Sequence, residues 1–346
     1  MYKIGICGHF GGEKTFLDGQ TIKTKTVADE LINIFGSKLI RTVDTYKWKY
    51  NPVTLIYKAI MLVKKSENIV VLPARNGVKI LIPLFLLLNK IYKHQLHYIV
   101  IGGWLPELLE GNTKLISRIA LYNGVYVETT SMLKKLNNLG LKNVIVMPNF
   151  KQLNILKENE LVYPKEKPYK LCTFSRVSKE KGIEDAINSV IAVNNFFGQT
   201  IFSLDIYGQP DVDYIVTFEE MIRNFPDYIK YKGMVEQKNS VEVIKNYMAL
   251  LFPTFYPGEG FAGTILDAYA SGVPVIASDW KYNKEIIMDR YNGFIFKTHN
   301  TEQLHNILID IGKNPENIIR LKKNCLKEAS NFMPNKVINC LVMNLR

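Results

Sequence analysis

The sequence has few cysteines and no long apolar stretch, and these absences exclude several classes of protein. Its four cysteines form no CxxC motif and no Cys/His cluster, so neither a disulfide framework nor a zinc site is predicted. The longest apolar run, Ile80–Leu88, is shorter than the ~20 residues of a membrane-spanning helix. Met1–Gly8 has no signal-peptide pattern. We therefore expect a cytoplasmic protein, soluble or peripherally bound to the inner face of the plasma membrane.

The length and the charge distribution indicate two domains of different character. The 346 residues exceed twice a typical domain of about 100–150 residues, and 47% of them are hydrophobic. Residues 1–160 carry 22 Lys and Arg against 11 Asp and Glu, a net charge of +11, whereas residues 161–346 carry 22 against 21. This one-sided positive field favours a polyanionic partner, either an anionic membrane, a phosphorylated acceptor or nucleic acid. The alternative is a general solubilising charge.

Short apolar segments alternate with longer segments of helical spacing in both halves of the chain. This alternation predicts βαβ units and parallel sheets that are covered on both faces. In the first half we expect strands at Lys3–Cys7, Lys38–Thr42, Asn68–Leu72, His97–Ile101, Val125–Val127 and Val144–Met147. In the second half we expect strands at Tyr169–Ser175, Ile201–Gly208, Tyr228–Lys232, Leu250–Pro253, Val273–Ala277 and Gly293–Phe296.

The charged, proline-bracketed segment Pro148–Pro168 has weak periodicity and is the predicted linker. The sequence thus predicts an α/β fold of two doubly wound, Rossmann-like domains, residues 1–160 and residues 161–330, facing a cleft. A last helical segment is expected within residues 331–346. In such sheets, ligands bind at the carboxyl ends of the strands.

Two turns that directly follow predicted strands carry residues suited to binding phosphate. The first is Gly8–Gly12, where glycines let backbone amides approach an anion. It is not a G-x-G-x-x-G motif, so a ligand loop and a simple tight turn both fit. The second is Ser175–Gly182, where Arg176 offers a planar fork and Lys181 a point charge. The alternative for this turn is a solvated basic surface.

A third turn, Pro253–Gly263, is rich in glycine and carries a carboxylate at Glu259. The amides of Gly260–Thr264 are suited to cradle an anion if a helix begins near Ala262. Asp267 follows Glu259 by eight residues, in the second turn of that helix. The alternative makes Glu259 a helix cap and Asp267 a surface residue.

Taken together, the second and third turns resemble a known family. An R-x-x-x-x-K-G turn at Arg176–Gly182, and an acidic pair with seven intervening residues at Glu259 and Asp267, are similar to the donor half of family 4 retaining glycosyltransferases of the GT-B fold, of the bacterial surface-polysaccharide type. The resemblance spans roughly residues 170–300. It departs from the family pattern at Asp267, where the family has Glu. The resemblance also implies that residues 331–346 pack back onto the first domain, which would bind the acceptor.

The resemblance implies a role for each matching residue. Arg176 and Lys181 would neutralise the donor diphosphate as the sugar leaves, and Glu259 would bind sugar hydroxyls; these three are the predicted catalytic residues. The predicted donor-binding residues are Gly11, Gly12, Gly260, Phe261, Ala262, Gly263, Thr264, Ile265 and Asp267. The shorter Asp267 would hold the ribose. Neither a cofactor nor a metal is expected, and a UDP-sugar is favoured over a GDP-sugar as donor.

The acceptor side is assigned to the first domain. Its candidate residues are His9, Arg75, Asn76 and Trp104, the last of which fits acceptor contact or core packing. The segment Tyr46–Lys65 interleaves aromatic residues with lysines, which suits a surface that meets anionic lipid headgroups. The alternative is an ordinary amphipathic helix packed on the sheet.

The sequence therefore predicts a retaining, metal-independent glycosyltransferase that acts on a glycan or lipid-linked acceptor in capsule, exopolysaccharide or lipopolysaccharide synthesis. Two alternatives remain: a non-catalytic nucleotide-sugar-binding or membrane-associated partner of such a pathway, and a nucleotide-sugar epimerase of the same fold. Nucleic-acid binding is disfavoured because no RRM, KH or helix-turn-helix signature is present.

Overall fold

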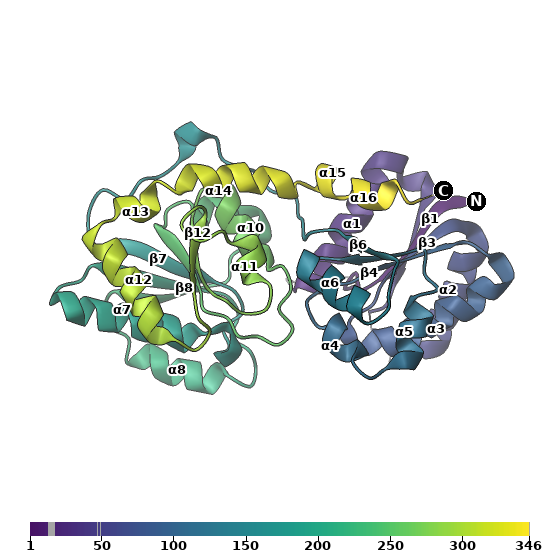
Figure 1. Ribbon diagram of the computed structural model, residues 1–346, viewed down its shortest axis with the longest axis horizontal. Helices are drawn as coiled ribbons and strands as arrows, with labels where there is room; N and C mark the ends of the chain where they lie inside the picture. The colour runs from purple at the N-terminus through teal and green to yellow at the C-terminus, as the bar shows by residue number, and fades with distance from the viewer. Residues whose placement is uncertain (13–17, 47, 49, 346) are drawn as a thin grey trace. The chain divides into compact units, whose positions relative to one another are not determined.

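The structure is a computed structural model that describes residues 1–12, 18–46, 48 and 50–345. The chain divides into two compact units, one formed by residues 1–152 with 332–346 and the other by residues 153–331. Each unit contains a six-stranded, fully parallel sheet with helices packed on it (Figure 1). The predicted α/β class with two doubly wound sheets is therefore confirmed.

The sheet of the first unit has the strand order β2-β1-β3-β4-β5-β6. Its strands are β1 (Tyr2–Gly8), β2 (Ile40–Asp44), β3 (Ser66–Leu72), β4 (Gln95–Ile99), β5 (Gly124–Val127) and β6 (Val144–Val146). Gly8 is in register with Asp44 on one side and Leu72 on the other, so the loops after these strands leave the same edge of the sheet. The predicted glycine turn and the Arg75 segment are therefore both at the carboxyl edge.

The helices of the first unit follow the expected apolar spacing. They are α1 (Gly19–Phe35), α2 (Pro52–Lys65), α3 (Arg75–Tyr92), α4 (Leu105–Leu109), α5 (Thr113–Ile119), α6 (Thr130–Asn138), α15 (Pro334–Val337) and α16 (Asn339–Val342). In α2, Asn51 caps the first turn by accepting a hydrogen bond from the Thr54 amide, and Pro52 occupies the first helical position. Among the residues described, no helix is both long and apolar enough to cross a bilayer.

The C-terminal segment completes the core of the first unit. Val337, Ile338 and Leu341 are buried together with Ile4 and Ile6 of β1. Helices α1, α15 and α16 lie on one face of this sheet, and α2, α3 and α5 lie on the other (Figure 1). The first unit thus depends on residues from both ends of the chain.

The second unit repeats the layered arrangement with the strand order β12-β11-β10-β7-β8-β9. Its strands are β7 (Tyr169–Phe174), β8 (Phe202–Tyr207), β9 (Ile229–Gly233), β10 (Ala249–Phe252), β11 (Val275–Ser278) and β12 (Gly293–Phe296). Its helices are α7 (Ile183–Phe197), α8 (Ile215–Arg223), α9 (Ser240–Ile244), α10 (Gly263–Ala270), α11 (Asn283–Ile286), α12 (Thr301–Lys313), α13 (Glu316–Ile319) and α14 (Lys322–Ala329). Each predicted strand of both halves overlaps one of these twelve strands.

The predicted linker is not a free connection along its whole length. Leu153, Leu156 and Leu161 are buried, and the Leu156 amide donates to the carbonyl oxygen of Ala270 on α10. Residues from Leu153 onward therefore belong to the second unit. Three leucines among charged residues give no regular period, which is why the sequence suggests only a linker there.

Candidate active site

The two predicted basic site residues, Arg176 and Lys181, lie on the turn between β7 and α7. Gly182 ends this turn with a φ of +71°, and a Cβ there would lie 2.1 Å from the carbonyl oxygen of Pro253. Only glycine fits such a left-handed position with backbone so close. The Lys181–Gly182 turn therefore packs directly against the end of β10, where the glutamate turn begins.

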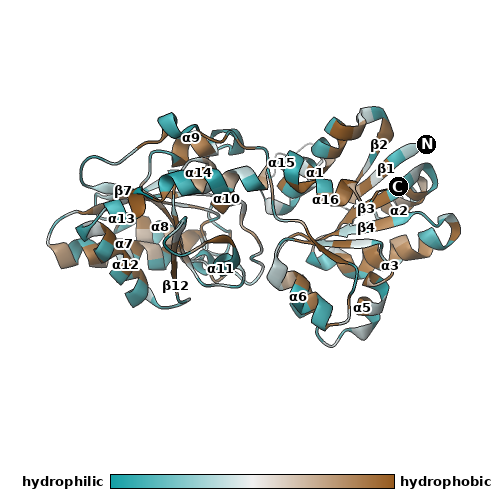
Figure 2. Ribbon diagram, turned by 45° about the horizontal axis from the view of Figure 1, so that its top comes forward, coloured by the Kyte–Doolittle hydropathy of each residue, from teal (hydrophilic) through white to brown (hydrophobic). Residues whose placement is uncertain are grey.

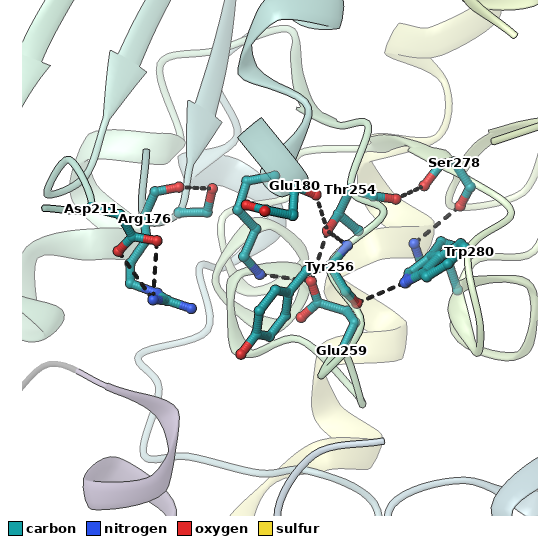
Figure 3. Close-up of polar contacts among 11 residues, drawn as sticks. Arg176, Glu180, Asp211, Thr254, Tyr256, Glu259, Ser278 and Trp280 are labelled. Atoms are coloured by element: carbon teal, nitrogen blue, oxygen red, sulfur yellow. Dashed lines mark hydrogen bonds and ion pairs between the residues drawn. The ribbon is translucent and has the colours of Figure 1, made fainter. Parts of the chain in front are cut away.

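Lys181 and Glu259 form a buried ion pair. The Lys181 Nζ lies 2.6 Å from Glu259 Oε2, and the two side chains are only 10% and 8% exposed. The Thr254 hydroxyl donates to the same carboxylate oxygen at 2.9 Å (Figure 3). Because charges removed from water are stable only when paired and hydrogen-bonded, each member of this pair holds the other in place.

Arg176 sits in a more open position at the same edge of the sheet. Its Nη1 donates to both carboxylate oxygens of Asp211 at 3.1 and 3.2 Å, and its side chain is about half exposed. The Tyr256 ring lies 5.4 Å from the Arg176 guanidinium and 4.9 Å from Lys181 Nζ. One aromatic ring thus lies near both cations, within the range of favourable cation–π attraction.

Residues at the end of β11 fix the backbone of the Thr254–Tyr256 segment. The Trp280 indole nitrogen donates to the Tyr256 carbonyl at 2.7 Å, and the Ser278 hydroxyl donates to the Thr254 carbonyl. These bonds join the ends of two neighbouring strands. The segment that positions Tyr256 and Glu259 is therefore fixed by hydrogen bonds from the end of the neighbouring strand β11 (Figure 3).

The glycine-rich turn leads into α10 and leaves that helix without a side-chain cap. The Thr264 Oγ1 is buried and has no hydrogen-bond partner among the described residues. Uncapped amides at a helix start, next to an unsatisfied hydroxyl, favour an anion. The Ile265 amide donates to the Ala262 carbonyl at 3.1 Å, and the phosphate contact of Ile265 stays a prediction.

The remaining donor residues of this turn have different surroundings. Gly260 and Phe261 are buried, whereas Ala262 and Gly263 are partly exposed. Asp267 is 4% exposed, and its Oδ1 accepts a hydrogen bond from the Ser240 hydroxyl at 2.7 Å. The shorter acid is thus fixed between α10 and the start of α9.

The glycine turn of the first unit is hydrogen-bonded to a carboxylate at the end of β2. Gly11 and Gly12 have positive φ values, but the Gly12 and Phe10 amides donate to the two carboxylate oxygens of Asp44, at 2.7 and 2.9 Å. Asp44 also accepts from the Tyr46 amide. The amide of Gly12 is therefore bonded to a carboxylate of its own unit, and the contact of Gly11 and Gly12 with a donor diphosphate stays a prediction.

The predicted acceptor residues lie in three environments. His9 Nδ1 is 2.9 Å from the Thr21 hydroxyl, which donates to Asp18. Arg75 and Asn76 are exposed at the start of α3. Trp104 is 7% exposed and its indole nitrogen donates to the Ile101 carbonyl, so it packs in the core, the alternative that the sequence left open.

The structure also places residues in the site that the sequence analysis did not select. These are Asp211, Thr254, Tyr256 and Trp280, together with Ser278. Ser278 is the last residue of β11, and the others follow the carboxyl end of a strand of the second sheet. Position after a strand end was therefore the available signal, although residue type alone did not single them out.

Comparison with known proteins gives a consistent result. The family model of the glycosyl transferases group 1 matches residues 154–329, about half of the chain. The GtfA subunit of a UDP-N-acetylglucosamine–peptide N-acetylglucosaminyltransferase from Streptococcus pneumoniae is 35% identical over 132 residues. That match covers 37% of this chain and 24% of GtfA, so the chain matches about a quarter of that relative's length.

Solved structures show the same fold over the whole chain. Anabaena HepE, crystallised with UDP, superposes with a TM-score of 0.77 at 14% identity and covers 99% of both chains. Sucrose-phosphate synthase from Thermosynechococcus elongatus gives a TM-score of 0.76 at 15% identity, covering 99% of this chain and 97% of its own. The predicted GT-B fold is confirmed by these neighbours.

Proposed function

The chain belongs to the glycosyl transferases group 1, and from this we propose that it transfers a sugar from a nucleotide-diphosphate donor to a glycan or lipid-linked acceptor. The observation that carries the proposal is the buried Lys181–Glu259 pair, with Arg176 and the uncapped start of α10 at the same edge of the sheet. Cations and a carboxylate gathered there fit a ligand that joins a diphosphate to a sugar.

The proposed mechanism follows from the charges that develop as the sugar–phosphate bond breaks. Negative charge grows on the departing diphosphate, and positive charge grows on the sugar. Arg176, Lys181 and the first amides of α10 would stabilise the diphosphate, which is usually the largest single catalytic contribution. Glu259 would bind the sugar hydroxyls. We propose retention of the anomeric configuration and no metal requirement, since these side chains supply the positive charge.

We favour a UDP-sugar as the donor. HepE was crystallised with UDP-glucose, and the pneumococcal GtfA with UDP and GlcNAc. Both proteins share the fold of this chain, and GtfA is also 35% identical to it over 132 residues. Surface-polysaccharide synthesis at the cytoplasmic face of the plasma membrane is the setting that we propose, because a lipid-linked acceptor would be presented there.

The test is nucleotide release from a panel of UDP-, GDP- and ADP-sugars in the presence of EDTA. Release from one sugar by the wild type, lowered about 100-fold in Arg176→Ala, would support the transferase mechanism. Arg176 is half exposed, so its removal leaves the core intact, and Glu259→Gln is the second variant. The exposed Glu236→Gln serves as control and should behave as the wild type.

Three outcomes would contradict parts of the proposal. Binding of a nucleotide sugar without turnover, even with membrane extract added as acceptor, would favour a non-catalytic binding protein. Conversion of the sugar without nucleotide release would favour the epimerase. Loss of activity in EDTA that added Mg²⁺ or Mn²⁺ restores would refute the metal-independent mechanism.

A further inference from the structure

Helices α2 and α3 expose apolar residues on the side that faces away from the sheet. In α2 these residues are spaced by three or four positions, opposite the buried Leu55, Ala59 and Leu62 that hold the helix on the sheet. The exposed apolar residues are Val53, Ile56, Tyr57 and Ile60 on α2 and Ile80, Leu87 and Ile91 on α3, between 37% and 77% exposed. Each helix is thus apolar on two faces, and only one is used in the fold.

The two exposed stripes lie on neighbouring helices. Helices α2 and α3 pack on each other and lie side by side on the same face of the first sheet (Figures 1 and 2). We call their seven exposed apolar residues the α2–α3 surface. Contiguous exposed apolar groups on this scale mark interaction sites more often than chance exposure.

The surroundings of the α2–α3 surface are strongly basic. Residues 51–93 contain Glu67 as their one acidic residue. The basic residues of this segment, all exposed, are Lys58, Lys64, Lys65, Arg75, Lys79, Lys90 and Lys93. The segment therefore carries a net charge of +6, about half the excess of the whole chain.

We propose that the α2–α3 surface docks on an anionic lipid bilayer. The apolar side chains would enter the boundary between headgroups and acyl chains, and the lysines would lie at the level of the lipid phosphates. An apolar stripe bordered by cations is the arrangement that such an interface requires. The proposal names a partner for the proposed function, yet docking itself does not depend on which donor the enzyme uses.

The α2–α3 surface extends to the edge of the first sheet that carries the predicted acceptor residues Arg75 and Asn76. Both α2 and α3 begin at the carboxyl edge of the sheet, because each follows a parallel strand that ends there. Arg75 and Asn76 occupy the first turn of α3, at this edge. A bilayer lying along the helices therefore reaches the edge where a lipid-linked acceptor would have to arrive.

Charge argues against the other occupant of such a surface, a second copy of the chain. Two copies meeting through the α2–α3 surface would bring together two segments of +6 with one glutamate each to offset them. Like charges at an interface are unfavourable and depleted from interface centres. An anionic bilayer converts the same charge into attraction.

The experiment is vesicle co-sedimentation of the full chain with phosphatidylglycerol-containing and pure phosphatidylcholine vesicles. One variant replaces three exposed apolar residues, Tyr57→Ser, Leu87→Ser and Ile91→Ser. A second replaces three lysines, Lys64→Gln, Lys65→Gln and Lys79→Gln. The matched control replaces three equally exposed apolar residues of the second unit, Phe196→Ser, Val216→Ser and Met234→Ser.

We expect the wild type and the control to bind phosphatidylglycerol vesicles and not phosphatidylcholine vesicles. The lysine variant should bind about 100-fold more weakly, since each lysine near an anionic surface is worth about a fivefold change in affinity. The apolar variant should also lose binding at unchanged thermal unfolding. Nucleotide release from a water-soluble donor should be equal in all four proteins, so docking and catalysis are measured separately.

Four outcomes would overturn the proposal. The wild type could fail to bind anionic vesicles, or could bind both kinds of vesicle equally. The control could lose as much binding as the apolar variant. A wild-type dimer that becomes monomeric in the apolar variant would instead identify a second copy as the occupant.

Discussion

The buried Lys181–Glu259 pair should be strongly coupled in stability, and its strength can be worked out from the structure. At a separation of 2.6 Å, the attraction in an effective dielectric of ~20 is about 6 kcal/mol. Burying two charges costs several kcal/mol for each, so the pair as a whole contributes little net stability. Removing one partner, however, leaves the other buried without compensation, at a cost of about 3–5 kcal/mol.

The perturbation is a double-mutant cycle with Lys181→Met and Glu259→Leu. We expect each single substitution to lower the unfolding free energy of the second unit by about 3–5 kcal/mol and the double substitution to restore most of it. The Thr254 hydroxyl keeps a partner in the double variant, because it also donates to the Glu180 carbonyl. The two charges should therefore behave as one unit.

The assay is urea unfolding followed by tryptophan fluorescence. Trp280 lies in the site of the second unit, and substitution of Trp48 and Trp104 by Phe makes it the only reporter. The exposed pair Lys238–Glu236 is the matched control, and its substitution should give no measurable coupling. Losses that simply add in the Lys181/Glu259 double variant would refute the reasoning.

Two further predictions concern the frame around the site. Gly182→Ala should destabilise the second unit by at least ~3 kcal/mol, because its φ is +71° and its Cβ would meet the Pro253 carbonyl oxygen; thermal unfolding measures this, and an unchanged melting temperature would contradict it. Burial lowers the pKa of Lys322 to about 8 from 10.5, so the unfolded chain binds a proton that the folded one releases between these pH values. The free energy of unfolding should therefore rise between pH 8 and 10.5. Urea titrations of Lys322→Met across that window should not show this rise.

The layout of the fold could be predicted from the sequence because it rests on local pattern. Each predicted strand overlaps an observed one, because most strands contain a short apolar run. The C-terminal segment was harder to place, since α15 and α16 are two short helices where the pattern predicts one. Local periodicity does not register the single break between them.

The sequence could predict only those site residues that stand together in one local motif. The Arg176–Gly182 turn and the Glu259 turn are visible as motifs, and the structure brings Lys181 and Glu259 into contact. Arg176 and Asp211 are 35 positions apart in the sequence, and Asp44 and Gly12, whose amide it accepts from, are 32 positions apart. Such contacts depend on which strands are neighbours in the sheet, and no local pattern contains that information.

The packing of residues 332–346 against β1 has a consequence for the order in which the protein is assembled. During synthesis the first sheet is made early, but Val337, Ile338 and Leu341 emerge only after the whole second unit. Until then, the apolar surface of β1, β3 and α1 that they cover is open to water and to other chains. The second unit, continuous from Leu153 to Asn331, has no such delay. On the ribosome, the first unit should therefore complete its folding after the second unit.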